Sequence, residues 1–186
     1  MARLTLVATR GGRHVAPMLR VRGVACVAIA IVLAGCGGAK PGGPPPADAV
    51  NAATRLLAAA AADDRIAFEA EIDRSAVRDD LRRQMVQLGQ QNRLEVDGGP
   101  SDFALDRMIG PQAVRLVDEG SRAPVRAPPS ASAVQHMLKM VGRREACLAD
   151  PTARDRCLMT FADGKGRWRL VGMQALGLEV PVRAGG

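Results

Sequence analysis

Aromatic side chains are scarce in this 186-residue sequence, which has no tyrosine, one tryptophan and three phenylalanines. Proteins that bind single-stranded nucleic acids stack bases on aromatic side chains, so this scarcity argues against nucleic-acid binding. The net charge of +7 points the other way, but its distribution weakens that interpretation. Residues 1–35 contain five arginines and no acidic residue, which leaves 21 basic and 19 acidic residues in the remainder. No nucleic-acid partner is therefore expected.

Long apolar runs are also missing. No stretch approaches the roughly 18 consecutive apolar residues of a membrane-spanning helix. The longest run covers 24–35 and follows Arg20 and Arg22. A basic segment followed by a short apolar segment that ends in small residues is typical of a secretory signal peptide. A more typical leader opens at Met18, which predicts translation from that residue rather than from Met1.

The end of the apolar run carries a more specific motif, Leu33-Ala34-Gly35-Cys36. This tetrad resembles the lipobox of bacterial lipoproteins. The resemblance implies cleavage between Gly35 and Cys36, with diacylglycerol on the Cys36 thiol and a fatty acyl group on its new amine. It also implies a chain anchored in the cell envelope and facing the periplasm. Gly37 follows the lipidated cysteine rather than aspartate, which favours the outer membrane over the inner one.

The remaining chain divides into a tether and one domain. Residues 36–47 hold the lipidated cysteine and a Gly/Pro-rich stretch with little to bury, which predicts a tether that holds the folded part away from the membrane. Residues 48–186 are long enough for one domain with a core of its own. We therefore expect a signal peptide over 1–35, a tether over 36–47 and a single domain over 48–186.

Apolar spacing predicts helices at the start of the domain. Asp48 is a candidate N-cap for an alanine-rich helix over 49–62. Asp63-Asp64 then marks a break or a new cap. Residues 73–88 place apolar side chains every three or four positions, which predicts an amphipathic helix with arginines on its other faces.

Three further helices are predicted in the middle of the domain. Ser101 or Asp102 can cap a short helix that ends at Met108. Gly110-Pro111 favours a second helix start, with the helix continuing through Val117. After a proline-containing connection at 120–130, a third amphipathic pattern runs through Val134, Met137, Leu138 and Val141.

The C-terminal part changes to a strand pattern. Residues 157–162, 167–173 and 178–182 predict strands, and Asp163-Gly164-Lys165-Gly166 is a hairpin turn between the first two. Helices followed by an antiparallel ribbon predict an α+β fold, with N-terminal helices and a small C-terminal antiparallel sheet.

Four cysteines separate into different roles. Cys26 leaves with the leader and Cys36 carries lipid, so Cys147 and Cys157 remain. In an oxidising compartment two remaining thiols favour a disulfide, and the turn residues around Pro151 suit the loop between them. Their spacing is neither that of a zinc site nor the Cys-x-x-Cys of a redox pair, and His136 is the one histidine after the leader. We expect no metal and no cofactor besides the lipid on Cys36.

Catalytic motifs are missing as well. No serine lies in a Gly-x-Ser-x-Gly elbow, and His136 has no partner motif. Adjacent carboxylates such as Asp79 and Asp80 do not share a helix face, so paired acid–base catalysis is not indicated. The sequence therefore predicts a protein that is not an enzyme.

Arginines on the helix over 73–88 offer a contact surface. Arg78, Arg82 and Arg83 are candidates to touch an acidic partner or anionic lipid headgroups and so reinforce the acyl anchor. The alternative, favoured by the near-neutral charge of the mature chain, is a solvated face balanced by neighbouring aspartates.

Short motifs resemble an uncharacterised family of exported bacterial proteins. They are Ile72-Asp73, Val77-Arg78-x-x-Leu81, Met108-Ile109-Gly110-Pro111-Gln112 and Arg167-Trp168-Arg169-Leu170. Gly110 stands where that family has threonine, and Arg74 lies near an expected phenylalanine. The resemblance implies a domain of unknown function and no catalytic residues.

These observations lead to one hypothesis and one alternative. The hypothesis is a lipid-anchored envelope protein whose domain binds or scaffolds an envelope partner without catalysis. The alternative is a periplasmic module for small apolar ligands, with a pocket near Phe161 and Trp168. A deep apolar cavity at those residues would favour the alternative, and a filled core would favour the hypothesis of a binding or scaffolding domain.

Overall fold

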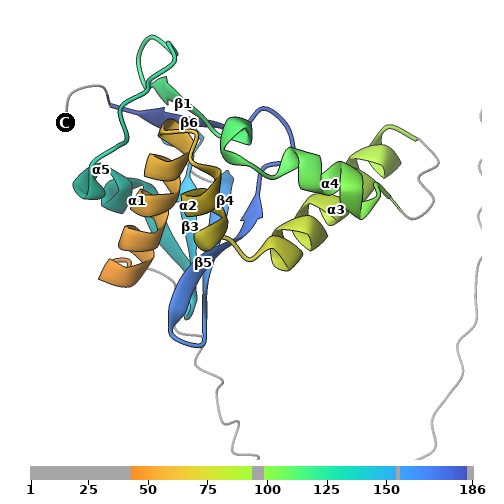
Figure 1. Ribbon diagram of the computed structural model, residues 1–186, viewed down its shortest axis with the longest axis horizontal. Helices are drawn as coiled ribbons and strands as arrows, with labels where there is room; N and C mark the ends of the chain where they lie inside the picture. The colour runs from red at the N-terminus through yellow and green to blue at the C-terminus, as the bar shows by residue number, and fades with distance from the viewer. Residues whose placement is uncertain (1–42, 94–98, 154–155, 184–186) are drawn as a thin grey trace, which may run out of the picture. The chain divides into compact units, whose positions relative to one another are not determined.

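Helices precede a small antiparallel sheet in the computed structural model, which describes residues 43–93, 99–153 and 156–183 (Figure 1). The arrangement is the α+β fold expected from the sequence. The helices are α1 (Ala47–Ala61), α2 (Arg65–Ala70), α3 (Arg74–Gln91), α4 (Asp102–Met108), the 3₁₀ turn η1 (Pro111–Ala113) and α5 (Ala131–Met137).

The strands form two separate sheets. Four consecutive strands pair antiparallel in chain order, β2-β3-β4-β5, and β1 pairs with β6 in a parallel two-stranded sheet. The β4–β5 hairpin turns at Lys165 and Gly166, whose φ angles of 56° and 82° are those of a primed turn. The strands are β1 (Arg115–Asp118), β2 (Leu138–Gly142), β3 (Glu145–Ala149), β4 (Cys157–Gly164), β5 (Arg167–Met173) and β6 (Glu179–Val182).

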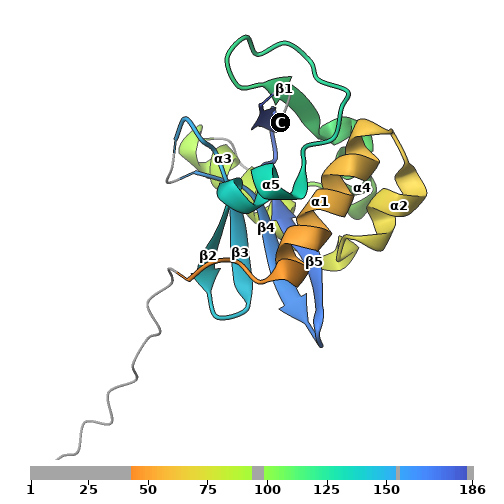
Figure 2. The same ribbon diagram turned by 90° about the vertical axis from the view of Figure 1, so that its left-hand side faces the viewer.

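Helix α1 covers one face of the four-stranded sheet. It crosses β4 and β5, with α5 beside it (Figure 2). Small alanines bring the helix close to the sheet, and Leu56 and Leu57 are fully buried beneath it. Phe161 and Leu170 meet them from the sheet, and both are also fully buried. The core therefore lies between α1 and the β4–β5 hairpin.

Helix α3 packs on the other side of β5 (Figure 1). The approach is so close that a Cβ on Gly172 would lie 2.8 Å from Asp80 Oδ2. Gln84 fixes Asp80 there, since its Nε2 donates to Asp80 Oδ2 at 2.7 Å and to the Met173 carbonyl at 2.9 Å. Gly172 therefore sets the spacing between α3 and β5.

The link between α2 and α3 extends the sheet by one bridge. Ile72 pairs parallel to Leu170, with the Leu170 amide donating to the Glu71 carbonyl at 2.9 Å. The Glu71 side chain is buried and accepts from Arg55 at 2.7 Å. This pair satisfies a carboxylate that would otherwise be costly to bury.

Predicted helix starts agree with the structure at three positions. Asp64, Asp73 and Ser101 each accept a hydrogen bond from the amide three residues later, and they begin α2, α3 and α4. The N-cap prediction for Asp48 is wrong. Pro46 occupies that position, and Asp48 lies in the first turn of α1, where its charge suits the helix dipole.

The helix predicted from Gly110-Pro111 through Val117 is also wrong. Only η1 forms, and Arg115–Asp118 become β1 instead. The Arg115 amide donates to the Leu178 carbonyl at 3.1 Å, as part of the pairing with β6. A strand that is distant in sequence therefore overrides the local start signal.

The helix predicted through Val141 ends at Met137. The following residues form β2, in which Leu138 is buried and Lys139 exposed. Leu138 and Val141 fit a helical spacing, but Leu138 pairs with Leu148 of β3, a strand that was not predicted, and Val141 lies at a register shift in β2. The strands β4, β5 and β6 agree with the prediction, although β6 pairs with β1 rather than joining the larger sheet.

Candidate functional site

The predicted lipidation and cleavage residues, Cys36 and Gly35, lie outside the described residues. The anchor therefore stays a prediction. Within the ranges that the structure describes, no helix is long and apolar enough to cross a membrane.

Two of the three predicted contact arginines join α3 to α4. Arg78 Nε donates to Asp106 Oδ1 at 2.7 Å, and Arg82 Nη2 donates to Asp102 Oδ1. Their side chains are 28% and 31% exposed. Both guanidinium groups are already paired, so their main contribution is to hold the short helix α4 on α3.

Arg83 is the most exposed of the three. Its side chain is 70% exposed and pairs with Asp80 at 3.1 Å, one turn away on the same helix. Exposed pairs of this kind contribute little to stability and exchange readily with solvent. Arg83 is therefore the member of the predicted set that an external anion reaches most easily.

A network centred on Asp106 ties three helices together. Arg74 Nη1 donates to Asp106 Oδ1 at 2.8 Å, and Arg74 also pairs with Glu69 of α2. The hydrogen bonds from Arg74 and Arg78 hold the pKa of Asp106 below its usual value, against a smaller opposing effect of desolvation. Asp106 is therefore ionised and hydrogen-bonded to both arginines, which makes it poorly suited to serve as a catalytic base.

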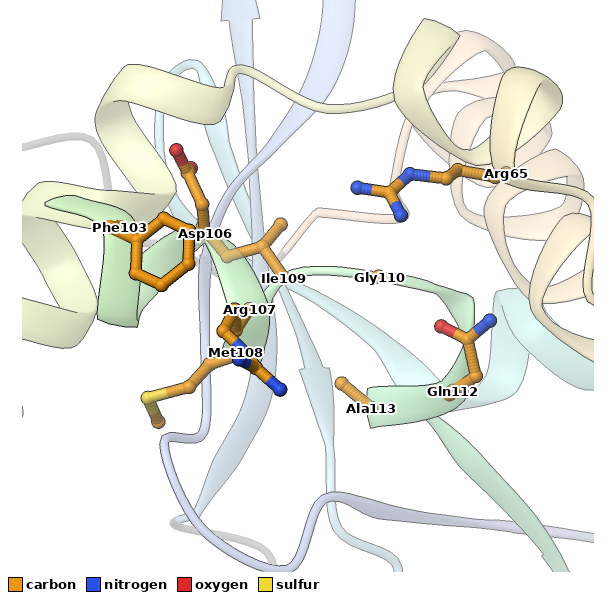
Figure 3. Close-up of a pocket in the computed structure, with 9 residues that line it drawn as sticks. All are labelled: Arg65, Phe103, Asp106, Arg107, Met108, Ile109, Gly110, Gln112 and Ala113. Carbon is orange, nitrogen blue, oxygen red and sulfur yellow. The ribbon is translucent and has the colours of Figure 1, made fainter.

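A pocket of about 550 Å³ opens beside this network (Figure 3). It lies between the start of α2 and the segment that connects α4 to η1. The residues around it are Arg65, Phe103, Asp106, Arg107, Met108, Ile109, Gly110, Gln112 and Ala113.

The cationic side chains of the pocket differ from those of the α3–α4 interface. Arg65 and Arg107 are both exposed, and within the described ranges neither forms an ion pair. Arg65 extends from α2 into the space opposite Arg107 (Figure 3). The Arg107 guanidinium lies 6.0 Å from the centroid of the Phe103 ring, at the limit of a cation–π contact.

Phe103 is the apolar counterpart of these arginines. Its side chain is 72% exposed, which is unusual for an aromatic residue in a chain with so few of them. The opposite wall is fixed by Gln112, whose Nε2 donates to Asp63 Oδ1 at 2.6 Å. Gly110 lies between them, and a Cβ there would come within 3.1 Å of Gln112 Oε1.

Arg65, Phe103 and Arg107 were not selected by the sequence analysis. Phe103 and Arg107 are four residues apart on α4, a spacing that places both on one helix face. That signal was present in the sequence. Arg65 carried none, because only the folded arrangement of α2 and α4 brings it to the same pocket.

The predicted cysteine pair is brought together by β3 and β4. Cys147 and Cys157 are paired, and their Cα atoms lie 5.6 Å apart, a spacing that suits a disulfide. The loop between them is fixed by Asp150, which is 2% exposed. Asp150 accepts from the Thr152 amide at 2.8 Å and pairs with Arg156.

The neighbours of Asp150 strongly lower the pKa of its carboxyl group. Burial raises its pKa, but hydrogen bonds from Thr152 and Arg156 outweigh this effect and lower the pKa to about 2. These contacts lie within the loop, so the group acts as a structural anchor for the connection between β3 and β4.

His136 is exposed on α5. It borders a second pocket, of about 540 Å³, together with Glu119, Asp150 and Arg183. Glu119 and Arg183 pair with each other at 2.8 Å, and Asp150 is engaged as described. The second pocket therefore offers His136 no uncommitted carboxylate among these residues.

Phe161 and Trp168, which the alternative places beside a ligand pocket, lie in the hydrophobic core. The two side chains are 0% and 8% exposed and belong to the hydrophobic core. Neither borders the two pockets described above. The core thus provides no observation in favour of the small apolar-ligand alternative.

No group of three or more potential metal-ligating side chains occurs within the parts of the chain that the structure describes. Comparison with models of known protein families, with curated proteins and with solved structures finds no match to this chain. The resemblance to the lipobox and to the exported family therefore stays a prediction based on short motifs.

Proposed function

We propose that this chain is a lipid-anchored protein of the bacterial cell envelope and that its domain is a non-catalytic binding or scaffolding module. The lipobox at Cys36 and the arginine-containing leader support export and anchoring in the outer membrane, facing the periplasm. The Cys147–Cys157 pair suits an oxidising compartment.

The exposed aromatic and its two arginines carry the binding part of this proposal. Aromatic residues and arginines are enriched at protein–protein interfaces and supply most of their binding free energy. Phe103, Arg65 and Arg107 gather at one pocket, while the neighbouring arginines of α3 are occupied by aspartates. This combination supports a partner-binding surface, hereafter the α2–α4 pocket.

Anchoring is tested by a Cys36→Ala variant of the full chain. The wild type incorporates labelled palmitate and fractionates with membranes, whereas the variant loses the label and leaves the membrane fraction. Two or more acyl chains suffice for stable anchoring, so the difference should be nearly complete. A membrane-bound but unlabelled wild type contradicts the proposal.

Binding is tested by photo-crosslinking in cells. A photoreactive phenylalanine analogue replaces Phe103, and a matched variant carries it at Val141 of β2, which is 49% exposed. We expect a discrete crosslinked product from position 103 and none of the same mass from position 141. Equal patterns at both positions, or no product at 103, count against a partner at the α2–α4 pocket.

A further inference from the structure

The α2–α4 pocket combines two arginines that have no carboxylate partner within the described ranges. Other exposed arginines, such as Arg126 and Arg143, also lack an ion pair there, but they do not line this pocket. In the pocket, Arg65 extends from α2 and Arg107 from α4 (Figure 3). Two guanidinium groups from different helices therefore face one volume of about 550 Å³.

Guanidinium groups bind carboxylates and phosphates through paired N–H donors. Asp106 also borders the pocket, but Arg74 and Arg78 both donate to its Oδ1. With Asp106 paired in this way, Arg65 and Arg107 leave the lining positively charged. The lining therefore favours an anionic ligand group.

The rest of the lining is apolar. The Phe103 ring, Met108, Ile109 and Ala113 border the same space. A ligand with an anionic end and an apolar substituent would engage both kinds of wall. The Phe103 ring offers its contact area at low entropic cost because it has only two side-chain torsions.

We propose that the α2–α4 pocket binds an organic anion, a carboxylate or a phosphate monoester, that carries an apolar or aromatic substituent, with Arg65 and Arg107 holding the anionic group and Phe103 packing on the substituent. This inference rests on the proposed binding function and specifies its ligand chemistry. A free small carboxylate and the C-terminal carboxylate of a peptide share this chemistry.

The probe is 3-phenylpropionate, titrated calorimetrically into the full chain purified in detergent. Its amide and phenyl phosphate serve as matched probes. We expect the carboxylate and the phosphate each to bind at least tenfold more tightly than the amide, and more weakly at high salt because the contact is ionic. Partition of a probe into detergent is the same for every protein variant and cancels in the comparison.

Arg65→Gln and Arg107→Gln are each expected to weaken binding of the carboxylate about tenfold or more. Each substitution removes one guanidinium group and its charged hydrogen bonds to the ligand. Arg143→Gln, an exposed arginine outside the pocket, is the control and should leave the affinity unchanged. Since neither pocket arginine forms an ion pair within the described ranges, both variants should melt at the wild-type temperature.

A tripeptide ending in phenylalanine distinguishes the two sources. Tighter binding than 3-phenylpropionate, lost on amidation of its C-terminus, identifies a protein or peptide end as the ligand; equal affinity identifies a small carboxylate. Affinity for the amide equal to that for both anions overturns the inference. If position 103 still crosslinks in that case, the proposed binding function stands and only the ligand class is wrong.

Discussion

Asp150 should make the stability of this domain depend on acid pH. Its carboxyl group is 2% exposed and accepts hydrogen bonds from Thr152 at 2.7 and 2.8 Å and from Arg156. These bonds lower its pKa from 3.8 to about 2. The difference corresponds to about 2 kcal/mol in favour of the folded state at neutral pH.

The direction of the pH dependence follows from the lowered pKa of Asp150. Above about pH 4 the carboxylate is ionised in both states, and the full contribution is present. As the pH falls towards 2, the unfolded chain takes up a proton before the folded chain does, so the contribution is lost. An Asp150→Asn variant cannot ionise and should lack this pH-dependent part altogether.

The measurement is urea unfolding of the wild type and of Asp150→Asn between pH 2 and 6. The difference in unfolding free energy should shrink by about 2 kcal/mol from pH 6 to pH 2. Asp79→Asn, whose side chain is 62% exposed, is the matched control and should show a small difference at every pH. A wild-type advantage over Asp150→Asn that stays constant across this range would falsify the assignment of the stabilising charge to Asp150.

Two further changes probe packing and covalent structure. Reduction of the Cys147–Cys157 pair should lower stability by up to about 3 kcal/mol, because it releases a short loop in the unfolded chain, and should lower the melting temperature by roughly 10 °C. Thermal melts with and without reductant check this, and an unchanged midpoint contradicts it. Gly172→Ala should cost about 1–3 kcal/mol in urea unfolding, since its Cβ would lie 2.8 Å from Asp80 Oδ2. Gly164→Ala, where nothing lies within 4 Å of the added Cβ, should cost much less.

Local signals in the sequence predicted three helix starts correctly. Asp64, Asp73 and Ser101 accept hydrogen bonds from nearby amides, and such capping depends on neighbouring residues alone. The hairpin at Lys165 and Gly166 is local in the same sense. Interactions of this range can be read from a short stretch of residues.

Strands that depend on distant partners could not be predicted in this way. Leu116 and Val117 fit a continuing helix as well as a strand, and only their pairing with Val180 and Pro181 decides between the two. Leu138 likewise satisfies either spacing until β3 pairs with it. Where apolar spacing permits both structures, tertiary pairing determines the outcome.

The candidate site shows the same difference between what local sequence reveals and what depends on distant residues. Arginines on α3 were recognised from the sequence, but the partners Asp102 and Asp106 lie on a different helix. The sequence therefore could not show that Arg78 and Arg82 are engaged. It also could not show that Arg65 and Arg107, on separate helices, border one pocket.

The parallel pairing of β1 with β6 bears on how the chain folds as it is synthesised. A ribosome releases β1 well before residues 179–182, so for that interval the strand lacks β6 and pairs through the bridge between Val117 and Pro124. Leu116 and Val117, 5% and 0% exposed in the finished fold, then lie on a strand with one open edge. An apolar strand with an open edge is prone to join strands of other chains. Pairing with β6 closes that edge, so the arrival of this strand protects β1 from association with other chains.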